Sequence, residues 1–130
     1  MTNSLLIGQV ISSRLEASQT LTALVGNQIF PVIADNDAKF PFVVYKRTSL
    51  SIINQTKDGY AEDMVSYEFT IVSTKYNESV EIANEIRKNM EKPKIVHELM
   101  TLCNNKIIQS TEEYSDGCFI QRLSFQSNIM

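Results

Sequence analysis

The feature that most constrains the fold is an alternation of apolar and polar residues near the middle of the chain. Every second position there is apolar: Val65, Tyr67, Phe69 and Ile71. Successive side chains of a strand point to opposite faces, so this pattern predicts a strand with one buried face. Upstream, Asp58-Gly59 is typical of a tight hairpin turn, because glycine adopts positive φ at little cost. The sequence therefore predicts a long antiparallel hairpin whose first strand begins at Pro41.

Further strands are predicted where β-branched and aromatic residues gather between turn signals. They span residues 28–33, 106–113 and 117–128, and Ser115-Asp116-Gly117 supplies the turn between the last two. In the final strand, Phe119, Leu123 and Phe125 share one face with Gln121 and Ser127.

Helices are predicted where apolar residues recur every three or four positions. The first covers about residues 3–17, with Asn3 or Ser4 as its cap. A short helical turn follows at 21–25, capped by Ser18 or Thr20 and ended by Gly26. The second main helix spans about 77–90, with Asn77 as its cap. Its apolar stripe is Val80, Ala83, Ile86 and Met90, widened by Ile82. The ambiguous stretch 95–103 is read as a further short helix.

These elements indicate an α+β fold, a mostly antiparallel sheet with a long β-hairpin packed against two main helices. At 130 residues the chain fits one domain, residues 1–130. The net charge of −3 argues against general binding of nucleic acid, which needs a basic face. The N-terminus has no basic leader and no apolar stretch is long enough for a membrane span, so we expect a protein made in a cytoplasm with reduced thiols.

No catalytic, metal-binding or cofactor-binding set is predicted. His97 is the one histidine, and its apolar neighbours favour a packing role over that of a catalytic base. Cys103 and Cys118 lack the spacing of a zinc site and are read as small hydrophobes. The pairs Glu62-Asp63 and Glu112-Glu113 are interpreted as solvated, because strand neighbours point to opposite faces. A basic cluster, Arg87, Lys88, Lys92 and Lys94, is read as the favourable charge of a helix C-terminus.

Three passages resemble one known family. The first runs from Leu21 to Pro31 and contains Val25-Gly26 and Ile29-Phe30-Pro31. The second is Phe40-Pro41-Phe42-Val43-Val44-Tyr45, and the third is the strand 65–76 with the helix after it. In this order they resemble the small tail completion proteins of long-tailed bacteriophages and prophages, also called tail terminator or head–tail joining proteins. Residues 92–105 have no counterpart in that pattern.

The resemblance implies a non-enzymatic virion protein that forms a ring, expected as a hexamer, at the head-proximal end of the tail. Such a ring terminates the tail tube and joins it to the head. The implied partners are copies of itself, the tail tube protein and the head completion or connector proteins, with no cofactor, no membrane and no sequence-specific nucleic acid. The implied location is the tail or neck of the virion, and the host bacterial cytoplasm during assembly.

The hairpin tip is the predicted contact between subunits of that ring. It carries Leu50, Ile52, Ile53 and Tyr60, whose apolar surface is difficult to bury within one small domain. The alternative, in which the tip folds back on its own sheet, has equal weight. A different class of function, a stand-alone α+β module for a ligand or peptide, also remains open.

Overall fold

The computed structural model describes residues 3–55 and 61–130, and the side chains of these except at 53–55, 61 and 62. A six-stranded sheet runs in the order β1-β2-β3-β6-β5-β4. Its strands are β1 (Ile29–Pro31), β2 (Phe42–Gln55), β3 (Ala61–Ser73), β4 (Lys94–Val96), β5 (Thr101–Ser115) and β6 (Cys118–Ile129). All neighbours are antiparallel except β1 and β2, which are parallel.

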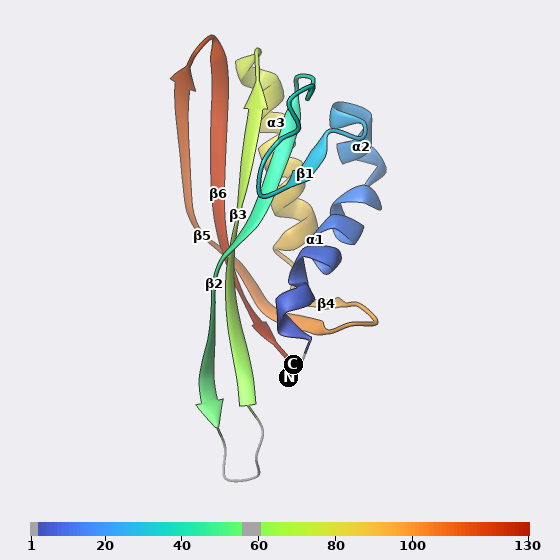
Figure 1. Ribbon diagram of the computed structural model, residues 1–130, viewed down its shortest axis with the longest axis vertical. Coiled ribbons are helices and arrows are strands. Elements are labelled where there is room, and N and C mark those ends of the chain that lie inside the picture. The colour runs from blue at the N-terminus through green and yellow to red at the C-terminus, as the bar shows by residue number, and fades with distance from the viewer. Residues whose placement is uncertain (1–2, 56–60) are drawn as a thin grey trace.

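Helices cover one face of this sheet and leave the other bare (Figure 1). They are a 3₁₀ turn η1 (Ser4–Leu6), α1 (Ile7–Glu16), α2 (Gln19–Val25) and α3 (Tyr76–Met90). The predicted α+β class, a mostly antiparallel sheet with a long hairpin packed against helices, is therefore confirmed.

The core lies between the helices and the central strands β3 and β6. The alternating residues of the predicted strand, Val65, Tyr67, Phe69 and Ile71, are fully buried, as the pattern required. Tyr67 stacks on Phe125 of β6 with 5.7 Å between ring centroids, and Phe69 meets the same ring edge-on at 5.5 Å. The three rings form the centre of the core.

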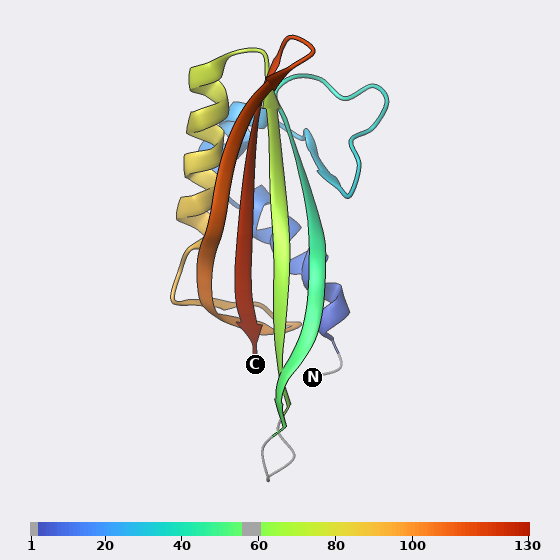
Figure 2. The same cartoon turned by 90° about the vertical axis from the view of Figure 1, so that its left-hand side faces the viewer.

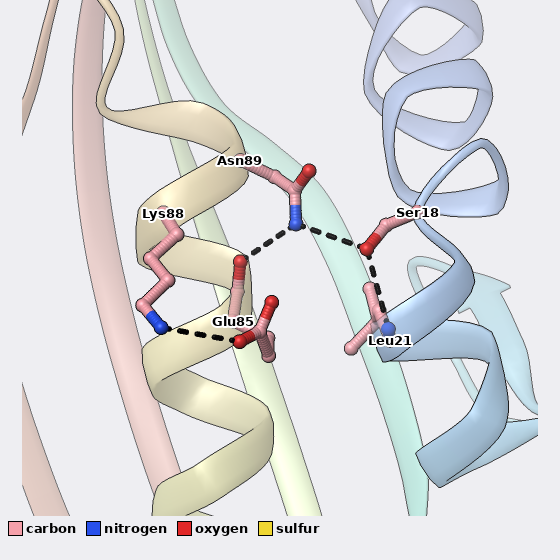
Figure 3. Close-up of polar contacts among 5 residues, drawn as sticks. All are labelled: Ser18, Leu21, Glu85, Lys88 and Asn89. Carbon is pink, nitrogen blue, oxygen red and sulfur yellow. Dashed lines mark hydrogen bonds and ion pairs between the residues drawn. The ribbon is translucent and has the colours of Figure 1, made fainter.

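Ser18 fixes the short helix α2 and ties it to α3 (Figure 3). Its Oγ accepts a hydrogen bond from the Leu21 N–H at 3.2 Å, which caps α2. The same oxygen accepts a bond from Asn89 Nδ2 at 3.2 Å, and Asn89 Nδ2 also donates to Glu85 O at 2.8 Å. Of the two caps considered from the sequence, Ser18 is the one used.

The other predicted helix caps are wrong. Asn3 and Ser4 are taken up in long-range bonds: Asn3 Nδ2 donates to Leu99 O, and Ser4 Oγ donates to the carboxylate of Asp63. Neither side chain caps the first helix. Asn77 is not a cap either, because α3 begins one residue before it, after Lys75.

The buried stripe of α3 is rotated from the predicted one. Val80 is exposed, while Ser79 takes the buried position beside Ile82, Ala83, Ile86 and Met90. The hydroxyl of Ser79 is satisfied there, since it donates to Tyr76 O at 2.6 Å. A small polar residue whose hydroxyl bonds within its own helix can therefore occupy a buried position without an unsatisfied polar group.

The predicted helix at 95–103 is wrong, because this stretch is a hairpin. Strand β4 pairs with the start of β5, with Ile95 opposite Leu102, and both side chains are buried. His97 holds the turn: its N–H donates to Met100 O, and its Nδ1 accepts from the Leu99 N–H, both at 3.0 Å. Two strands joined by a tight turn place apolar residues at spacings that a helix also produces.

Candidate functional site

The β2–β3 hairpin projects beyond the body of the sheet (Figures 1 and 2). The last row that β3 shares with β6 pairs Asp63 with Ile129. Beyond it, β2 and β3 continue as an isolated pair, Asn54 opposite Glu62 and Gln55 opposite Ala61. An isolated two-stranded ribbon is only marginally stable in water, so this segment is a candidate for contact with a partner.

Two of the four predicted interface residues, Leu50 and Ile52, have described side chains, and both lie in rows that β6 still supports. Leu50 lies opposite Val65 and is half-buried against the core. Ile52 lies opposite Asp63, and 63% of its surface is exposed. Ile53 belongs to β2, but its side chain lies outside the described residues, and so does all of Tyr60. Leu50 and Ile52 therefore mark the passage from the core to the projecting ribbon.

A buried carboxylate at the root of the hairpin escaped the sequence reasoning. Asp63, predicted to be solvated, is 5% exposed, and its carboxylate accepts a hydrogen bond from the buried hydroxyl of Ser4. The two residues are 59 positions apart, so no local pattern pointed to the pair. This contact fastens the N-terminal turn to the strand from which the projection begins.

The other acidic pair behaves as predicted, with its two members on opposite faces. Glu113 is paired with Arg122 on the bare face. Glu112 lies on the helix side, where it accepts bonds from Tyr76 Oη at 3.1 Å and from Gln121 Nε2 at 3.0 Å. The bond to Glu112 raises the pKa of Tyr76, since the carboxylate favours the protonated phenol.

Tyr76, Glu112 and Gln121 also line a small recess at the end of the β5–β6 hairpin. Tyr114 and Phe119 complete its wall, with their ring centroids 4.9 Å apart. The recess holds about 230 Å³, below the usual range of ligand pockets. A wider hollow of about 360 Å³ lies on the bare face, where Val32 and Ile33 overhang Lys46, Glu68 and Arg122.

The remaining residues that carry chemistry lie apart from one another. His97 is held in the β4–β5 turn, Cys118 is buried, and Cys103 Sγ lies 3.1 Å from Met130 Sδ. Within residues 3–55 and 61–130, no group of three histidine, cysteine, aspartate or glutamate residues is placed to hold a metal ion. No helix in the described part of the chain is long and apolar enough to cross a membrane.

The predicted basic cluster is partly neutralised within its own helix. Arg87 pairs with Glu91 at 3.1 Å. Lys88 pairs with Glu85 at 3.4 Å, as Figure 3 shows. Both pairs join residues three or four positions apart, the spacing that brings side chains together on a helix. Lys92 and Lys94 are exposed beyond the helix end. The interpretation as ordinary helix-end charge fits this arrangement.

Comparison with known proteins identifies the fold. No family model and no curated protein matches the chain. Among solved structures, a chain in the virion of a native gene transfer agent particle superposes with a TM-score of 0.72. The match covers 92% of this chain and 90% of that chain, at 10% sequence identity. The two chains therefore share a fold over nearly their whole length.

Proposed function

We propose that this protein is a non-enzymatic virion assembly protein that forms a ring at the head-proximal end of a phage tail. Two independent lines support this. The order of sequence passages resembles tail completion proteins, and the fold is similar to that of a chain in a gene transfer agent virion. In this role residues 1–130 act as one tail-completion unit that terminates the tail tube and joins it to the head.

The observation that carries the proposal is the projecting β2–β3 ribbon. Its described end is unsupported by β6, and Ile52, in the last row that β6 supports, exposes 63% of its surface. A large exposed apolar side chain at the root of an isolated ribbon is typical of a surface that a partner covers. In the proposed ring, which we take to be a hexamer, Leu50, Ile52, Ile53 and Tyr60 contact the neighbouring subunit.

The proposed partners are copies of this chain, the tail tube protein below the ring and the head completion or connector proteins above it. The protein would work in the host cytoplasm during assembly and remain in the tail or neck of the virion. It needs no cofactor, membrane or specific nucleic acid sequence for this role. Its acidic balance, −3 overall, suits a channel component that DNA passes without adhering.

Electron microscopy of lysates from the parent phage, with this gene deleted, tests the role directly. Loss of a tail terminator predicts overlong or irregular tails beside unjoined, DNA-filled heads. Complementation by the wild-type gene should restore tails of uniform length, which controls for effects on neighbouring genes. Normal infectious particles from the deletion would refute the proposal.

The alternative function is a stand-alone module that binds a ligand or peptide. The observation that favours it is the recess of about 230 Å³ beside Tyr76, Tyr114 and Phe119, where rings and carboxylates converge. A cationic group would suit such a wall. Titration with methylammonium and guanidinium probes, followed by NMR shifts of these rings, distinguishes the two. The ligand-binding module would be favoured by two results together: NMR shifts that saturate with the probe, and unchanged tails in phage that lack this gene.

A further inference from the structure

The outer edge of strand β5 is open along most of its length. Strand β4 pairs only with Thr101–Cys103, the Ile107 N–H donates to Glu91 Oε2 at 3.0 Å, and no other described strand adds to that edge. A register irregularity between Ile107 and Gln109 leaves Ile108 out of the ladder, and 55% of its surface is exposed. Bulges of this kind re-aim a side chain. An open strand edge with an exposed isoleucine is a typical site of contact with another chain.

The opposite edge of the sheet displays apolar residues as well. Strand β1 ends at Pro31 in a three-residue turn, in which the Ile33 N–H donates to Pro31 O at 2.6 Å. The central residue, Val32, has a φ of 66°, an unfavourable value for a β-branched side chain. The turn exposes 69% of Val32 and 76% of Ile33. Backbone strain at a turn that exposes two hydrophobic side chains suggests a contact.

These two apolar edges lie at the same height of the sheet. The Val32 N–H donates to Tyr45 O, and the row of Tyr45 continues through Phe69 and Leu123 to Ser110 of β5. Ile108 is two positions from Ser110. A second pair of exposed apolar residues also lies at one height, in the row of Phe42, three positions from Tyr45 along β2. Phe40 stacks on Phe42, whose row runs through Val72 and Ile120 to Glu113, the neighbour of the exposed Tyr114.

From this matched height we infer that the β1 edge of one subunit packs against the β5 edge of the next copy of this chain. Val32 and Ile33 contact Ile108, and Phe40 contacts Tyr114. This inference rests on the proposed ring and names its subunit interface. Two different patches on one subunit give a head-to-tail contact, which closes into a ring when successive copies are related by rotation alone. Patches at one height allow successive copies to meet by rotation without a rise about an axis along the strands, the geometry that a closed ring requires.

Charge and sheet geometry agree with an apolar contact. The carboxylates of the β5 edge are already partnered within the subunit: Glu112 by Tyr76 and Gln121, and Glu113 by Arg122. The β5 edge therefore brings no unpaired carboxylate to the contact. It joins a loop to a strand edge and not two strands, so the twist between the outer strands of the sheet does not oppose it. Figure 2 shows the loop after β1 and strand β5 at opposite sides of the sheet.

Disulfide trapping tests the inference in the full-length protein. Cys103→Ser and Cys118→Ala remove the native thiols, and Ile33→Cys with Ile108→Cys places one new thiol on each edge. Because each subunit carries both halves of the contact, mild oxidation should yield a ladder of covalent oligomers ending at the ring size. Each single cysteine variant should yield no ladder. Ser13→Cys with Ile108→Cys is the matched control, since Ser13 is exposed on helix α1 and belongs to neither strand edge.

Each outcome decides the inference. A ladder in the double variant, absent from both single variants and from the control, establishes the head-to-tail contact. Covalent dimers from a single variant would reveal a symmetric contact and overturn it. Absence of a ladder would overturn it too, whether the protein is monomeric or assembled through other surfaces. A ring that forms without cross-links would overturn this interface but not the proposed function. The proposed function is judged separately, by tail length in phage that lack this gene.

Discussion

The hydroxyl of Tyr67 should report on the integrity of the core. Its Oη lies 2.8 Å from Ser127 Oγ, both residues are fully buried, and the ring stacks on Phe125. Tyr67→Phe keeps the ring and removes the hydroxyl, which leaves the oxygen of Ser127 without this partner. An orphaned buried polar group costs about 1–3 kcal/mol. For a chain of 130 residues each kcal/mol lowers Tm by about 4 °C.

Ser127→Ala closes a double-mutant cycle. It should destabilise by a similar amount, because the Tyr67 hydroxyl is then the orphan. The double variant replaces both polar groups with apolar ones, so its stability should lie near that of the wild type. The coupling energy is the departure of the double variant from the sum of the two single variants. Thermal and urea unfolding followed by circular dichroism measure all four proteins.

The same residue predicts how stability changes with pH. Burial raises the pKa of Tyr67 from its ordinary 10.0 to about 12. Between these values the unfolded chain loses the phenolic proton while the folded protein keeps it, so the free energy of unfolding falls as pH rises. The full loss approaches about 3 kcal/mol. Below pH 10 both states are protonated and this effect is absent. Tyr67→Phe removes the titrating group, so its profile should be flatter above pH 10.

Urea unfolding of both proteins at pH 7, 9, 10.5 and 11.5 supplies the comparison. Every other ionisable group is common to both proteins and cancels in the difference. Parallel profiles above pH 10 would refute the claim that this phenol is protonated and buried in the folded state. Strictly additive effects in the cycle would refute the hydrogen bond to Ser127.

Three further outcomes are expected. Ile52→Asp with Ile53→Asp should give a folded protein that no longer assembles, as judged by sedimentation; unimpaired assembly would contradict the hairpin contact. Ser18→Ala should lower stability by about 1 kcal/mol, because it removes the cap of α2, whereas the exposed alternative Thr20→Ala should change it little. Ser4→Ala should cost about 1.5–3 kcal/mol, because it removes a donor from the buried carboxylate of Asp63, with the exposed Ser13→Ala as control. Equal melting temperatures for Ser4→Ala and Ser13→Ala would contradict that account.

Local periodicity predicted the elements that bury one face. Tyr67 and Phe69 alternate with polar residues and are buried, and the turn before Cys118 forms where Asp116 and Gly117 supply positive φ. Periodicity failed where two structures share a spacing, as at Ile95 and Leu102, which pair across a hairpin instead of lining a helix. It also failed for the caps of the first helix, whose side chains serve distant partners.

The candidate site was only partly predictable, for a physical reason. That the hairpin exists follows from its own residues, but its projection depends on where β6 ends, at Ile129 opposite Asp63. Strand order is a long-range property, and so is the parallel pairing that sends β1 to the edge beside β2. The exposure of Val32 and of Ile108 follows from that order, so it emerges only with the complete sheet.

The two proposed contacts lie at different heights of one sheet, and this separation constrains how a ring could use them. Leu123 marks the row of the edge contact, and Ile129 marks the row where the hairpin leaves the body. Six strand residues separate these rows, about 20 Å. Sites this far apart with no shared partners act independently. Damage to the hairpin and damage to the edges should therefore add in assembly free energy. A ring held at two heights resists tilting of its subunits, which a single contact would permit. The bare sheet face need not be covered in such a ring, since both contacts lie at its margins.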